Sequence, residues 1–311
     1  MPLTDLANPS RFLAFADRAL PWLAATTVLA FAFGVSQLYG APDDYQQGAT
    51  VKIMFIHVPA AWLGIFAWVL MSIAALGTLV WRHPLADVAA RAAAPIGAAF
   101  TLMCLVTGSL WGRPMWGTYW VWDARLTSVL VLFLMYLGVI ALWRTIDDPT
   151  RGARAVAVLT LVGAINIPII KFSVDWWNTL HQPASVLVLF FLYLGYIALV
   201  NAFDDPSRGG RAGSLLALVG IVNLPIIKFS VDWWNTLHQP ASVLRLGGPR
   251  IDVSLLIPLL VMAFGFALLF GWLLLLRMRS QLNEKKARAL SLYGHPAASA
   301  DDSAPALPAW Q

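Results

Sequence analysis

Charged side chains are scarce in this chain of 311 residues. Asp, Glu, Lys and Arg together make up 12% of it, whereas soluble proteins carry roughly a quarter. Hydrophobic residues make up 59% and occur in long runs, which excludes a soluble globular domain. The composition therefore predicts an all-α protein, a polytopic membrane helical bundle in which residues 1–311 form a single membrane domain.

Cysteine is almost absent, and this excludes several classes of site. The single copy, Cys104, lies within a hydrophobic run, so no disulfide can form within the chain. The sequence has no C-x-x-C-H segment, so the chain is not itself a c-type cytochrome. It also has no cluster of Cys or carboxylate residues with the spacing of a zinc or copper site.

The hydrophobic runs predict how often the chain crosses the membrane. A helix needs roughly 20 apolar residues to cross the hydrocarbon core of a bilayer. Eight runs approach that length and predict eight spans, which lie at 20–38, 59–81, 94–111, 128–144, 155–171, 186–203, 212–228 and 253–276. An even number of spans places both termini on the same side of the membrane.

The basic residues predict which side that is. Seven of the 21 Lys and Arg lie on the face opposite the termini, and the other fourteen lie on the face that holds them. This excess places the termini in the cytoplasm. The outward loops are then 39–58, 112–127, 172–185 and 229–252, and the tail 289–311, rich in Ala, Pro and Ser, is predicted to be disordered in the cytoplasm.

A tandem repeat of 57 residues occupies the middle of the chain. Residues 131–187 and 188–244 align without a gap, and 41 of the 57 positions are identical. Each copy contains two of the predicted spans, so a second copy leaves the orientation of the following helix unchanged. Removal of one copy leaves six spans. We favour a recent duplication, or an artefact of sequence assembly, without a functional role of its own.

Tryptophan is concentrated in the predicted outward loops. Eight of the 15 Trp residues lie there or at the edge of a loop, and the stretch 116–127 is the densest. An aromatic belt at the membrane surface would explain Trp alone, but a belt requires no charges at fixed spacing, and here Asp123 and Arg125 follow directly. The alternation of Trp120 and Trp122 would align two indoles in an extended segment. Such an apolar surface beside a cation suits a flat, conjugated ligand that carries carboxylates.

Three of the five histidines lie near outward helix ends, on the same face as these tryptophans. His57 precedes the second span, and His181 and His238 occupy the repeated segment Leu-His-Gln-Pro. A lone interfacial His is more often structural, but two from separate loops can ligate one iron from opposite sides of a macrocycle. Flat aromatic stacking, two imidazoles and nearby cations together indicate haem.

The stretch Trp116–Thr127 resembles the motif W-G-x-W-W-x-W-D-x-R-L-T of haem-handling proteins in cytochrome c biogenesis. The segments Ile56–Pro59 and Leu237–Pro240 narrow the resemblance to the CcmC family, over roughly residues 15–280. It implies a six-helix inner-membrane protein that holds haem transiently and non-covalently (b-type) at the periplasmic face. It further implies no enzymatic activity, delivery of haem to the chaperone CcmE, and association with the ABC-transporter subunits CcmA and CcmB and with CcmD.

The resemblance also implies roles for individual residues. The haem platform would consist of Trp116, Gly117, Tyr119, Trp120, Trp122 and Asp123, where Tyr119 replaces the usual Trp and can still stack. The cations that would pair with the propionates are Arg125, Lys52 and Arg245. One iron ligand would be His57, and the other would be His238 or its duplicate His181. We favour His238, because the family-like continuation at 245–249 follows only that copy.

Two other functions are compatible with parts of this pattern. A WWD-type haem lyase, which attaches haem to apocytochrome, usually has more spans and further intramembrane histidines, and no His lies deep within a predicted span here. A solute transporter with an aromatic belt would place ionisable groups at mid-membrane, and the predicted spans contain almost none.

Overall fold

The computed structural model describes residues 8–179, 183–201, 203, 205–221, 243, 248–249 and 251–293. Within them all the regular secondary structure is helical, and one isolated β-bridge joins Asp44 and Gly48 in a loop. The helices are α1 (Pro9–Gly40), the short 3-10 helix η2 (Ala49–Ile53), α2 (Met54–Val80), α3 (Pro84–Trp116), α4 (Ala124–Thr145), α5 (Pro149–Gly163), α6 (Asn166–Thr179), α7 (Pro183–Asn201), α8 (Pro206–Ile221) and α10 (Val253–Tyr293). The predicted all-α bundle is confirmed.

Six helical stretches are long and apolar enough to cross a membrane. They are Pro9–Gly40, Ala49–Val80, Leu85–Trp116, Ala124–Thr145, Pro149–Phe172 and Val253–Ser291. Six of the eight predicted spans coincide with them, which makes this a multi-pass membrane protein. The predicted span 186–203 corresponds to the shorter apolar helix Leu189–Asn201, and 212–228 extends beyond the part of the chain that the structure describes.

The loops in the structure are shorter than predicted, because the helices continue past their apolar runs. The loop predicted at 112–127 is reduced to 117–123, since α3 runs to Trp116 and α4 begins at Ala124. The segment 172–179, also predicted as loop, belongs to α6. A hydrophobic run marks only the part of a helix that contacts hydrocarbon, so it underestimates the length of the helix.

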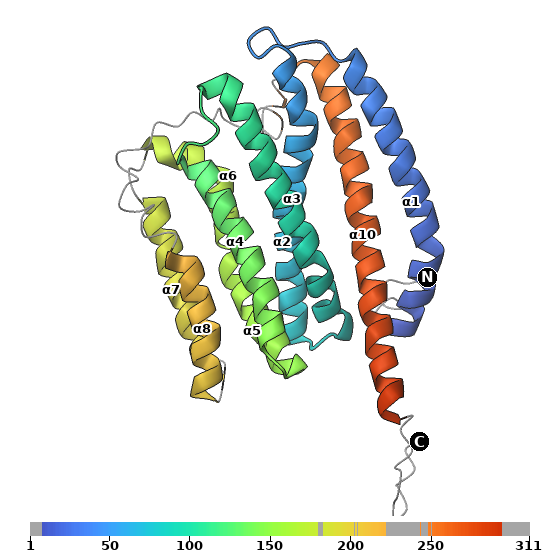
Figure 1. Ribbon diagram of the computed structural model, residues 1–311, viewed down its shortest axis with the longest axis vertical. Coiled ribbons are helices and arrows are strands. Elements are labelled where there is room, and N and C mark those ends of the chain that lie inside the picture. The colour runs from blue at the N-terminus through green and yellow to red at the C-terminus, as the bar shows by residue number, and fades with distance from the viewer. Residues whose placement is uncertain are drawn as a thin grey trace, which may run out of the picture.

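Figure 1 shows the helices side by side, with α1 and α10 at one flank and α7 and α8 at the other. α1 packs on α10, α2 contacts α3, α5 and α10, and α4 contacts α3, α5, α6 and α8. We call the end of the bundle that carries residues 41–53 and 117–123 the loop end. The opposite end, where α1 begins and α10 ends, is called the terminal end.

The centre of the bundle is built around two large aromatic side chains. Trp68 of α2 and Tyr136 of α4 are fully buried, and their rings meet edge to face with centroids 4.7 Å apart. The Tyr136 hydroxyl donates to the Gly64 carbonyl at 2.7 Å, and Trp68 Nε1 donates to the Thr160 carbonyl at 3.1 Å. These bonds satisfy both polar groups in an apolar interior and tie α2 to α4 and α5.

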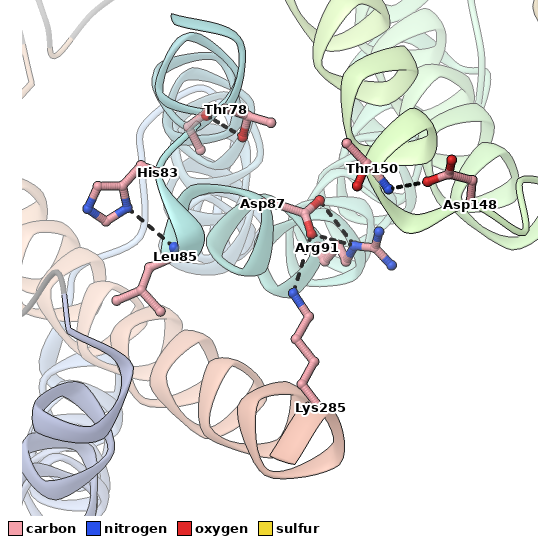
Figure 2. Close-up of polar contacts among 9 residues, drawn as sticks. Thr78, His83, Leu85, Asp87, Arg91, Asp148, Thr150 and Lys285 are labelled. Atoms are coloured by element: carbon pink, nitrogen blue, oxygen red, sulfur yellow. Dashed lines mark hydrogen bonds and ion pairs between the residues drawn. The ribbon is translucent and has the colours of Figure 1, made fainter. Parts of the chain in front are cut away.

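A charged cluster joins three helices at the terminal end (Figure 2). Asp87 of α3 accepts from Arg91 Nε at 3.1 and 3.0 Å, and Lys285 Nζ of α10 lies 3.7 Å from the same carboxylate. The Cζ of Arg91 lies 5.3 Å from the ring centroid of Trp143 on α4. A half-buried carboxylate with two cationic neighbours fixes the register of α10 against α3 at this end.

Candidate functional site

The Trp-rich segment forms the short loop between α3 and α4 at the loop end (Figure 1). Gly117 ends α3 in the left-handed conformation with φ 74°, and its N–H donates to the Arg113 carbonyl at 3.0 Å. A residue with a side chain is strained at this φ. The Arg113 guanidinium donates to the Gly117 carbonyl, and its Cζ lies 5.4 Å from the centroid of the Tyr119 ring. The turn and one arginine thus fix the first half of the loop.

Asp123, the acidic residue of the motif, fixes the other end of the loop. It is only 2% exposed, and its carboxylate accepts from the Leu126 N–H at 2.7 Å in the first turn of α4. A carboxylate in this position satisfies a helix N–H that has no partner within the helix, and it lies at the positive end of the helix dipole. The position of Asp123 directly after the tryptophans is therefore explained locally, because this residue caps the N-terminus of α4.

The two central indoles of the loop meet edge to face. The ring centroids of Trp120 and Trp122 are 5.4 Å apart, with an angle of 79° between the planes. The expectation that the alternation aligns them was wrong, because opposed ring quadrupoles favour the edge-to-face contact. Trp120 Nε1 is buried and has no hydrogen-bond partner among the described residues. The loop thus carries two indole rings that are nearly perpendicular to each other. The Nε1 of Trp120 is a donor without a partner among the described residues.

The third ring of the motif lies at the end of α3. Trp116 is half-buried, and a Cβ added at Gly112 would lie 3.0 Å from its Cε3. Tyr119, by contrast, is 56% exposed. The absence of a side chain at residue 112 therefore lets the Trp116 indole lie back against its own helix, while the neighbouring phenol faces outward.

His57 lies in the first turn of α2, at the same end of the bundle as the Trp-rich loop. Its Nδ1 is 3.1 Å from Thr107 Oγ1 on α3, and its ring meets the Trp111 ring edge to face at 5.7 Å. Gly108 lies between these two residues, and a Cβ there would come within 2.9 Å of His57 Cε1. The imidazole is therefore packed between α2 and α3, with its position set by one helix turn of α3.

The segment before α2 completes this environment. Trp111 Nε1 donates to Gln47 Oε1 at 2.9 Å, which connects α3 to the loop between α1 and α2. Lys52 of η2 pairs with Asp43 across the same loop at 3.0 Å. The structure therefore brings His57, Trp111 and the 41–53 loop together into one packed unit.

The remaining predicted residues are described only in part. Arg125 is half-buried in the first turn of α4, two residues after the capping Asp123. His181, His238 and Arg245 lie outside the described residues. α6 ends at Thr179, two residues before His181, and Asn166 at its start donates to the Ser128 carbonyl of α4 at 2.9 Å.

Sequence analysis missed Thr107 and Trp111, which contact His57, and Gln47, which accepts a hydrogen bond from Trp111. The spacing of Thr107 and Trp111, four apart near the outer end of a predicted span, was the available signal. Within the described part of the chain, no group of three or more His, Cys, Asp or Glu could hold a metal ion. An iron ligated by single imidazoles from separate segments requires no such cluster.

The family model described as CcmC, heme exporter protein C, matches residues 2–187 and 184–293, two ranges that meet where the repeat copies join. A heme exporter protein C of Bradyrhizobium diazoefficiens is 59% identical over 94% of this chain and 89% of its own length. That of Haemophilus influenzae is 37% identical over 92% of this chain and 94% of its own. That of Escherichia coli K12 is 52% identical over 59% of this chain and 75% of its own.

Proposed function

The chain belongs to the CcmC, heme exporter protein C, family, and on this premise we propose that it binds haem at the loop end and passes it on for c-type cytochrome maturation. The role is one of handling and transfer, not of catalysis. Haem is the cargo, held non-covalently and transiently, as in a b-type haem protein.

The observation that carries this proposal is the placement of His57. Its ring lies at the end of the bundle that also carries Trp116, Tyr119, Trp120 and Trp122. An imidazole is a common axial ligand of haem iron, and aromatic faces stack on a porphyrin. The buried Nε1 of Trp120, which has no partner among the described residues, is a donor that a carboxylate-bearing ligand can satisfy.

The motif residues divide into two groups by what they contact. We assign the stacking surface to the four rings named above. Gly117 and Asp123 support it by closing the loop at its two ends. Their replacement is expected to weaken haem binding indirectly, through the position of the rings.

The second iron ligand is assigned from the packing of the repeat. The continuation at 245–249 favours His238, as the sequence predicts. The packing favours His181, because it follows α6 by two residues and α6 packs on α4, the helix that begins at the Trp-rich loop. We propose His181, since a ligand must approach His57 in space and, among the described residues, the helices of the first copy are the ones that pack extensively on α2 and α3.

The propionates require cations near the stacking surface. We propose Arg125 for this role, because it lies two residues past the end of the Trp-rich loop. Lys52 is a second candidate on the 41–53 loop, where its ion pair with Asp43 would have to share or release the ammonium group. Arg245 is retained from the sequence as a third.

The membrane orientation and the partners follow from the same assignment. The excess of Lys and Arg at the terminal end supports cytoplasmic termini and a loop end on the periplasmic face of the bacterial inner membrane. We propose that haem leaves from this face to the chaperone CcmE, and that the chain works with CcmA, CcmB and CcmD.

The test is the haem content and absorption spectrum of the purified protein. His57→Ala is expected to lose most of the haem and the Soret band that it produces. His83→Asn is the matched control, because His83 lies at the terminal end and only caps α3 through its Nδ1, an acceptor that Asn keeps. Unchanged haem content and an unchanged Soret band in His57→Ala would overturn the proposal.

A further inference from the structure

One hydroxyl on α3 determines how His57 is presented. Thr107 Oγ1 lies 2.7 Å from the Met103 carbonyl, 3.3 Å from the Cys104 carbonyl and 3.1 Å from His57 Nδ1. We propose that Thr107 is a positioning residue that fixes the tautomer and the direction of the His57 ring. This inference rests on the proposed function, in which His57 ligates haem iron.

The direction of the hydrogen bond follows from counting hydrogens. A carbonyl oxygen can only accept, so the single hydroxyl hydrogen of Thr107 is donated to Met103, its nearest acceptor. The hydroxyl oxygen then has lone pairs left for His57, and Nδ1 must be the donor. The proton of the neutral imidazole therefore lies on Nδ1, and the lone pair that can ligate a metal lies on Nε2.

The ring is held in its plane by the neighbours of Thr107. Gly108 leaves room for His57 Cε1, which a Cβ would crowd at 2.9 Å. Trp111 covers the ring edge to face at 5.7 Å, and its own indole is tied to Gln47 at 2.9 Å. One turn of α3 thus contacts the His57 imidazole in three ways. Thr107 accepts its hydrogen bond, Gly108 leaves space for it, and Trp111 packs against it.

A purely local explanation of Thr107 accounts for only half of its contacts. Thr within a helix commonly donates to the carbonyl four residues before it, and Thr26 of α1 does so toward Trp22 at 2.8 Å. Thr107 makes that bond and also accepts from a ring 50 residues away. Acceptors of this kind set the tautomer of metal-ligating His residues and increase the basicity of the ligating nitrogen.

The test compares variants of Thr107 in the purified full-length protein. Thr107→Val keeps the shape of the side chain and removes the hydroxyl that accepts from His57. We expect this variant to lose haem to apomyoglobin about tenfold faster than wild type and to have a higher haem reduction potential. Thr107→Ser keeps the acceptor and should behave as wild type. Thr26→Val is the control for loss of a helical back-bond alone.

Two outcomes separate this inference from the proposed function. Haem loss and potential that match wild type in Thr107→Val, while His57→Ala loses haem, would overturn the role of Thr107 and leave His57 as the ligand. Wild-type haem binding in His57→Ala would overturn the proposed function itself. If the valine side chain disturbs the contact between α2 and α3, Thr107→Ala replaces Thr107→Val as the variant without a hydroxyl. It is then compared with Thr107→Ser in the same way.

Discussion

Two repeated stretches of this chain, residues 131–187 and 188–244, are packed in different environments although 41 of their 57 positions are identical. Tyr136 in the first copy is fully buried and bonded to the Gly64 carbonyl, whereas Tyr193 at the same repeat position is 64% exposed. α4 and α5 of the first copy contact α3 and α2, while α7 and α8 of the second copy pack on α5 and α4. The neighbours of a helix, and not its own sequence, decide here which side chains become core.

The two copies agree where the structure is local. Asp148 accepts from the Thr150 N–H at 2.8 Å, and Asp205 accepts from the Ser207 N–H at 2.9 Å. Each Asp also pairs with the Arg three residues later, at 3.5 and 3.6 Å. The Asp-Asp-Pro turn therefore folds the same way in both places, because all of its partners lie within the repeat unit.

Truncation of the repeated tyrosine should give the largest difference between the copies. Tyr136→Ala empties a fully buried site and removes the hydrogen bond that its hydroxyl donates to the Gly64 carbonyl, so we expect a loss of about 3 kcal/mol. Tyr193→Ala removes an exposed ring that stacks on Tyr196 and should cost below about 1 kcal/mol. Unfolding of both variants in detergent measures the difference, and equal losses would contradict the unequal packing of the copies.

A methyl group added to the repeated glycine should separate the copies by a smaller amount. A Cβ at Gly163 would overlap Met135 Cε and Trp68 Cζ2, so Gly163→Ala should destabilise the fold by about 1–3 kcal/mol. At Gly220 the nearest atom among the described residues is Leu192 Cδ1 at 3.9 Å, so Gly220→Ala should be neutral or slightly stabilising. Thermal melts of the two variants provide the comparison, and a Gly220→Ala loss as large as that of Gly163→Ala would refute it.

Removal of the helix cap should affect the two copies alike. Asp148→Ala and Asp205→Ala each abolish one N-terminal cap on an exposed turn, so both should lower the melting temperature slightly and by similar amounts. A large effect in one copy alone would show that its turn has a partner outside the repeat. Asp148→Asn and Asp205→Asn, which keep a capping acceptor, serve as controls.

The smallest effect concerns pH. Hydrogen bonds from the backbone N–H groups of Arg151 and Thr150 hold the pKa of Asp148 below its ordinary value. Because the folded-state pKa is depressed, this stabilisation is present above the unfolded pKa and is lost as the pH falls through the folded one. Asp148→Asn should therefore lose slightly less stability than wild type in acid melts, between about pH 5 and 3. A larger acid loss in the variant would contradict this.

The sequence predicts the membrane class and six of the spans because both depend on long apolar runs. It also predicts that the Trp-rich segment is a loop, because the segment lies between two apolar runs. The exact ends of this loop, at Gly117 and Asp123, come from the structure. The sequence does not predict the partners of His57. The four-residue spacing of Thr107 and Trp111 indicates that they share one face of α3, but it does not indicate that this face meets His57 of α2.

The unequal burial of the repeat could not have been predicted either. Prediction from residue propensity or from hydrophobic pattern gives the same burial for the same residue at equivalent repeat positions. Tyr136 and Tyr193 can therefore be distinguished only when the neighbouring helices are known. The same limit applies to the choice between His181 and His238, whose flanking residues 168–187 and 225–244 are the same. The continuation at 245–249 favours His238, whereas the packing of the first copy against α2 favours His181.

The most direct test of the account is a comparison of His181→Ala with His238→Ala, by the Soret and α bands of the purified proteins in the reduced state. If haem is held between α2 and the first copy of the repeat, His181→Ala should lose the low-spin spectrum and His238→Ala should keep it. Loss of that spectrum in His238→Ala, with His181→Ala unchanged, would contradict the assignment of the site to the first copy.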